Sequence, residues 1–97
     1  MSKERRQIAK SIAHSLRKGV IGTTKIADYP KSKIVFRMTY PSAGSGEDSQ
    51  VIEEAQKAID TFELNKTEMG DVHLYMTLLD GSNAIDEELV GSFWDGE

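Results

Sequence analysis

The chain contains no cysteine among its 97 residues. This absence excludes a disulfide scaffold, a cysteine zinc site, an iron–sulfur cluster and a thiol nucleophile. It agrees with a cytoplasmic location, where disulfides are rare. Long apolar runs are also missing, since the longest strictly aliphatic or aromatic run is Ile34-Val35-Phe36. We therefore expect neither a membrane span nor a secretory signal.

Acidic residues are scarce in the first part of the chain, and basic residues are scarce in the rest. Residues 1–41 hold ten Lys or Arg and two acids, a net charge of +8. Residues 42–97 hold two Lys and fourteen acids, a net charge of −12. Such a separation of charge along the chain indicates which partners the protein can bind rather than which fold it adopts. The length and the 38% hydrophobic content predict a single globular domain over residues 1–97.

Two segments show the apolar spacing of amphipathic helices. Residues 3–18 repeat apolar side chains every four positions, Ser2 can cap the start, and Gly19 suits the left-handed position after a helix. The second helix is predicted over residues 48–64, after a loop rich in Gly and Ser. Its predicted buried stripe consists of Val51, Ile52, Ala55, Ala58, Ile59 and Phe62.

Alternating apolar and polar residues predict two strands, over residues 33–40 and 72–79. A short edge strand is expected over residues 23–28. Residues 83–94 are ambiguous, because acids after a Ser-Asn start favour a short helix, whereas a fourth strand ending in Phe93-Trp94 is the alternative.

The expected fold class is α+β: a single small domain of α-β-β-α-β order. Its two helices pack on one face of a three-stranded sheet, or of a four-stranded sheet if residues 83–94 form a strand. The second helix is long enough to return the chain across the sheet. We therefore expect strands 33–40 and 72–79 to be parallel neighbours joined by a right-handed crossover, with strand 23–28 antiparallel on the outside.

The first helix carries basic side chains away from its apolar stripe. Lys and Arg displace counterions from phosphates, so this face suits a nucleic acid. A plain solvated face is the simpler interpretation, because the helix has no aromatic residue to stack on bases and the chain has no nucleic-acid motif. Docking of an acidic protein is a third interpretation. The alternative nucleic-acid-binding residues are Lys3, Arg5, Arg6, Lys10, Arg17 and Lys18.

Acids gather in and around the second helix. Exposed together, they could occupy a basic site on a partner protein and exclude its normal ligand. The leading hypothesis is therefore a non-enzymatic regulatory or inhibitory protein, such as a phage or mobile-element inhibitor of host machinery. Trp94 is either a core residue, which we prefer, or an exposed anchor of this interface. The predicted acidic docking face consists of Glu47, Asp48, Glu53, Glu54, Asp60, Glu63 and Trp94.

Motifs for catalysis or metal binding are weak. His73 lies two residues from Asp71, which is half of an acid–base site, but no nucleophile or second base can be named. His14 is expected to be half buried beside the first apolar stripe, and neither histidine has a third ligand at metal spacing. We expect no enzymatic activity, no cofactor and no metal. A homo-oligomer would form if the basic part of one copy met the acidic part of another.

Overall fold

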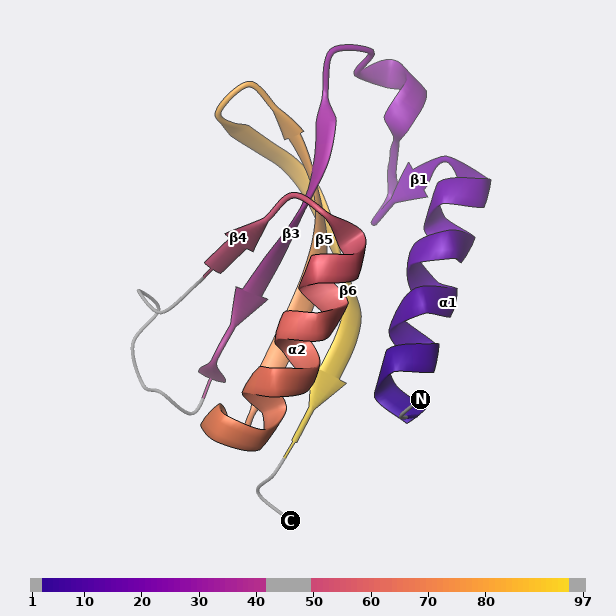
Figure 1. Ribbon diagram of the computed structural model, residues 1–97. Helices are drawn as coiled ribbons and strands as arrows, with labels where there is room; N and C mark the ends of the chain where they lie inside the picture. Colours follow the sequence, from indigo (N-terminus) through magenta and orange to yellow (C-terminus); the bar gives the residue numbers. More distant parts are fainter. Residues whose placement is uncertain (1–2, 42–49, 95–97) are drawn as a thin grey trace.

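The computed structural model describes residues 3–41 and 50–94 (Figure 1). It has α+β architecture, as predicted, and the two helices lie on one side of the main sheet. The elements in chain order are α1 (Lys3–Lys18), β1 (Val20–Ile21), β2 (Thr24–Lys25), the 3-10 helix η1 (Ile26–Asp28), β3 (Lys33–Thr39), β4 (Gln50–Ile52), α2 (Ala55–Met69), β5 (Val72–Asp80) and β6 (Asn83–Phe93).

The main sheet has four strands in the order β4-β3-β5-β6, and every neighbouring pair is antiparallel. Strands β3 and β5 are neighbours, as predicted, but the expected parallel pairing is wrong. The physical reason is β4, which pairs back on β3 and reverses the chain before α2 begins. Helix α2 therefore connects β4 to β5, which run parallel to one another on either side of β3.

Helix α2 begins seven residues later than predicted, at Ala55 instead of residue 48. Val51 and Ile52 lie in β4 and alternate across the sheet, so Ile52 is buried whereas Val51 is 60% exposed. Two adjacent apolar residues fit either a helical stripe or a strand. Of the remaining predicted stripe, Ala58, Ile59 and Phe62 are buried, and Ala55 is partly buried against the core. The Ser2 cap predicted for α1 lies outside the described residues.

The segment before β3 does not form the expected edge strand. In the described part of the chain, β1 and β2 pair only with one another, in a small hairpin directly after α1. Gly19 takes the predicted left-handed conformation between α1 and this hairpin, with a φ of 70°. The last element is a strand, β6, as in the alternative prediction. Phe93 packs against the core, but Trp94 is 59% exposed, so its preferred assignment to the core is wrong.

The core lies between the sheet and the two helices. Helix α1 contributes Ile8 and Ile12, and α2 contributes Phe62. Helix α1 comes very close to β6 at Gly91, where an added Cβ atom would lie 2.5 Å from Cγ1 of Ile8. A glycine at this position lets the helix rest on the strand backbone. This contact leaves α1 on the outside of the fold, beside the edge of the sheet (Figure 1).

Candidate functional site

The outward side of α1 carries a row of cations, which we call the basic stripe: Lys3, Arg6, Lys10 and Arg17. All four side chains are exposed. At about 100° per residue they fall within an arc of roughly 60°, opposite the buried Ile8, Ile12 and Ser15. The helical rise places the first and last about 21 Å apart along the axis. The stripe is therefore straight, and its widest interval, about 10.5 Å, lies between Lys10 and Arg17.

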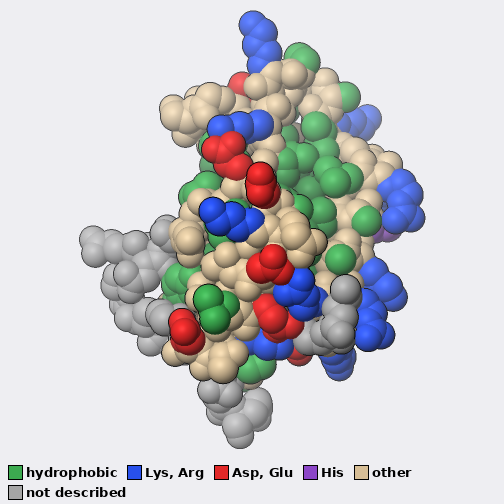
Figure 2. Space-filling view, in the orientation of Figure 1, with side chains coloured by type: hydrophobic (Ala, Val, Ile, Leu, Met, Phe, Trp, Pro, Cys, Tyr) green, Lys and Arg blue, Asp and Glu red, His purple; other side chains and the backbone are tan. Residues whose placement is uncertain are grey.

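No carboxylate of the described residues lies within ion-pair distance of the basic stripe. Glu4 is the one acid in α1, and its carboxylate lies 2.8 Å from Nζ of Lys66 on α2, away from the stripe. Figure 2 shows Lys and Arg side chains following one another down the side of the molecule that α1 forms. Lys18 and His14 flank the stripe, and His14 is exposed, so its expected half burial is wrong.

Arg5 does not belong to this surface, although the sequence placed it there. Its Nη2 atom lies 2.6 Å from Oδ1 of Asp60 on α2. The hydrogen bond from Arg5 lowers the pKa of Asp60 below its ordinary value. Helical geometry gives the reason, because Arg5 lies only about 60° from the buried side of α1, next to α2. The predicted nucleic-acid set therefore loses one member.

The predicted acidic docking face is partly neutralised by nearby cations. Glu47 and Asp48 lie outside the described residues. Asp60 pairs with Arg5, and Glu63 lies 2.5 Å from Lys66. Glu53 lies 3.8 Å from Lys33, and Glu54 is exposed. Red and blue side chains are accordingly mixed over α2 in Figure 2. The separation of charge along the chain is not kept on this part of the surface.

Two further acids, Asp86 and Glu88 of β6, hold the β1–β2 hairpin. Glu88 accepts hydrogen bonds from Oγ of Ser15, at 2.8 Å, and from the backbone N–H of Gly22, at 2.9 Å. Asp86 accepts from Oγ1 of Thr24, at 2.8 Å, and from the backbone N–H of Thr23, at 3.1 Å. These bonds fix the hairpin against β6, and with it the end of α1.

The carboxylates in these contacts make stability depend on acid pH. The bond from Lys66 lowers the pKa of Glu4 below 4.5, and the bond from Thr24 lowers the pKa of Asp86 below 3.8. The unfolded chain therefore binds more protons than the folded chain as the pH falls through these ordinary values. We expect the free energy of unfolding to decrease below about pH 4.5 and to continue decreasing through the lowered pKa values.

Urea titrations at pH 7, 5, 4 and 3 measure this effect. The variant Asp86→Asn should be less stable at pH 7 and should lose less stability on acidification than the parent, because one of the responsible carboxylates is gone. A denaturation midpoint that rises between pH 5 and pH 3 would contradict the assignment.

The sheet face that the helices leave open carries a separate polar cluster. Arg37 donates two hydrogen bonds to Glu87, at 2.6 and 3.1 Å, and its guanidinium lies 4.6 Å from the centre of the Tyr75 ring. The bond to Glu87 raises the pKa of Arg37. Thr77 also donates to Glu87, and His73 meets Tyr75 edge to face. The charges of this cluster are satisfied internally, so it offers no free cation or anion to a ligand.

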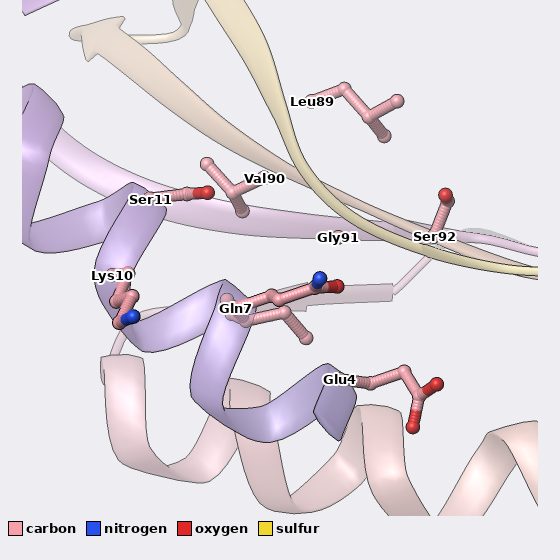
Figure 3. A pocket seen from close by; sticks show the side chains of 9 residues that line it. Glu4, Gln7, Lys10, Ser11, Leu89, Val90, Gly91 and Ser92 are labelled. Atoms are coloured by element: carbon pink, nitrogen blue, oxygen red, sulfur yellow. The ribbon is translucent and has the colours of Figure 1, made fainter. Parts of the chain in front are cut away.

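An open groove of about 460 Å³ runs along the contact between α1 and the end of β6. Figure 3 shows Gln7 and Ser11 extending from α1 toward the strand, whereas Lys10 points away from it. Glu4, at one end of the groove, is bonded to Lys66. The described residues contain no group of three His, Cys, Asp or Glu side chains able to hold a metal ion. The basic stripe is therefore the best-supported candidate site.

Comparisons with known proteins leave this site to be interpreted from its geometry. No protein-family model matches the chain, and no curated protein or solved structure matches it. Within residues 3–41 and 50–94, neither helix has the length and apolar character needed to cross a lipid bilayer.

Proposed function

We propose that this protein is a non-enzymatic nucleic-acid-binding module that works in the cytoplasm. The observation that carries the proposal is the basic stripe, whose four cations have no carboxylate partner among the described residues. The acids of α2, in contrast, are mostly paired with cations of the same molecule. A row of phosphates supplies the missing counter-charge, and release of its condensed counterions favours binding.

The stripe also has a structural cost that solubility does not explain. Like charges three or four residues apart repel, as in Lys3–Arg6 and Arg6–Lys10, and each pair costs about 0.2–0.5 kcal/mol of helix stability. A surface that serves solubility alone can mix both signs. The exposed Ala9 and Ala13 beside the cations leave room for close approach to the helix. An anionic partner accounts for both features.

A second proposal keeps the inhibitory protein that docks on a basic site of a partner. The exposed Trp94 favours it, since tryptophan is common at the energetic centres of interfaces. Pairing of Asp60 and Glu63 within the molecule weakens it, because a partner would have to replace these internal ion pairs. We therefore rank it below the nucleic-acid module.

The test is binding of labelled 20-nucleotide duplex and single-stranded ligands, followed by fluorescence anisotropy at several salt concentrations. Four stripe cations predict a slope of log affinity against log salt of about −4 on duplex DNA. The triple variant Arg6→Ala, Lys10→Ala, Arg17→Ala should bind about 100-fold more weakly at low salt and reduce the slope by about 3. Circular dichroism confirms that the helix remains, because alanine favours helix.

The matched control removes three cations elsewhere, in the variant Lys31→Ala, Lys33→Ala, Lys57→Ala. It changes the net charge by the same amount, and we expect its affinity to stay within about threefold of the parent, since these residues lie off the stripe. Equal weakening of both variants would mean that net charge alone drives binding. Absence of binding by the parent protein at low salt would overturn the proposal, and capture of a basic protein would then support the second one.

A further inference from the structure

From the exposure of α1 we infer that the nucleic acid is double-helical DNA and that α1 enters its major groove. This inference rests on the proposed function and names the class of its ligand.

Helix α1 is exposed over more than half of its circumference. The exposed side chains begin at Leu16 on one flank, continue through the basic stripe and end at Lys18 on the other. At about 100° per residue this arc covers roughly 200°. An α-helix has a diameter of about 10–12 Å, and the major groove of B-DNA is about 12 Å wide and 8.5 Å deep. A helix that projects this far can enter the groove rather than only touch its rim.

The side chains of the arc match what the major groove displays. Arg6, Lys10 and Arg17 lie at its centre, where their charge can neutralise phosphates on both sides of the groove, and Arg or Lys on guanine O6 and N7 is the commonest base contact. The exposed Ala13 can contact a thymine methyl group. The single acid of α1, Glu4, is bonded to Lys66 and so does not repel the DNA.

Cations at the two ends of the helix can add further phosphate contacts. Lys3 stands at the first end, and Lys18 and the exposed Lys25 of β2 stand at the other. The hairpin that carries Lys25 is fixed to β6 by Asp86 and Glu88, so this cation keeps its place relative to α1. Contacts of this kind set the position of a protein on the duplex, while the groove contacts read bases.

The alternative nucleic acids fit less well. Double-stranded RNA has a deep and narrow major groove that side chains do not reach. Single strands are held mainly by stacking on aromatic rings, and α1 contains no aromatic residue other than the exposed His14. A surface that sensed phosphate charge alone would bind all three polymers in proportion to their charge density.

The experiment compares duplex DNA, duplex RNA and single-stranded DNA of one mixed 20-nucleotide sequence, at one salt concentration, with the full chain. We expect duplex DNA to bind at least about 10-fold more tightly than either alternative. The variant Ala13→Leu keeps every charge but adds bulk within the arc, next to Arg6. We expect it to weaken binding of duplex DNA about 10-fold and to leave single-strand binding unchanged.

The matched control is Ala27→Leu, an identical change at an exposed position in η1, which should bind as the parent does. Similar affinity for all three polymers, or preference for RNA or single strands, would overturn the major-groove inference while the proposed function stands. An unchanged duplex affinity in Ala13→Leu would also overturn it. Failure to bind any of the three would overturn the proposed function as well.

Discussion

Replacing Gly91 by valine is expected to lower the free energy of unfolding by about 3 kcal/mol, at the upper end of the usual cost of overpacking a core. An added Cβ atom would lie 2.5 Å from Cγ1 and 2.7 Å from Cδ1 of Ile8. Ile8 is 1% exposed and packs in the core. Valine adds two further carbons at the same place, so α1 must shift away from β6.

Urea denaturation of four proteins tests this expectation: the parent, Gly91→Val, Ile8→Ala and the double variant. Ile8→Ala alone should cost about 2–5 kcal/mol, because it leaves a cavity. The double variant should cost less than the sum by more than about 1 kcal/mol, since the valine then occupies space that Ile8 has left. The control is Ser92→Val, a change at the exposed residue next to Gly91. Its free energy of unfolding should stay within about 0.5 kcal/mol of the parent value. Additive costs in the double variant would show that the two residues are not in contact.

Replacing Glu88 by alanine is expected to cost about 2 kcal/mol, because hydrogen bonds to charged groups contribute roughly 1.5–3 kcal/mol. The change removes the acceptor of two donors, Oγ of Ser15 and the N–H of Gly22. Ser15 is 2% exposed, so water cannot readily replace the carboxylate. A buried hydroxyl without a partner pays its full desolvation cost.

Thermal and urea denaturation measure this cost, with two companion variants. Adding Ser15→Ala to the Glu88→Ala variant should cause little further loss of stability, since the unsatisfied hydroxyl disappears. Glu54→Ala removes an exposed acid at the start of α2 and should stay within about 0.5 kcal/mol of the parent. If Glu54→Ala and Glu88→Ala have equal effects, Glu88 does not anchor the hairpin.

Local patterns predicted the elements whose structure depends on nearby residues. The end of α1 at Lys18 is the one expected, because Gly19 follows it in the left-handed conformation. The buried face of β5 follows from simple alternation in the same way. The predictions of the start of α2 and of the direction of β3 relative to β5 were wrong for one common reason. Both depend on β4, whose three residues become a strand only by pairing with β3.

The candidate site was predicted in part. The spacing of residues in the sequence located the cations of α1. At 100° per residue, the angular position of Arg5 on the helix separates it from the basic stripe. The pairing of the acids with cations could not be predicted from local patterns, because the ion pairs join residues that are far apart in the chain. Arg5 and Asp60, for example, are 55 residues apart, and they meet only because α1 and α2 pack side by side on the sheet.

The packing of α1 against β6 also determines when, during folding, the basic stripe becomes a fixed surface. Ser15 and Glu88 are 73 residues apart, so the hydrogen bond between them closes one of the longest loops in the molecule. Contacts so remote in the chain slow folding. Until they form, α1 is a 16-residue helix near the length at which isolated helices are only marginally stable in water. The surface proposed to meet nucleic acid is therefore completed late in folding, when the last strand has joined the sheet.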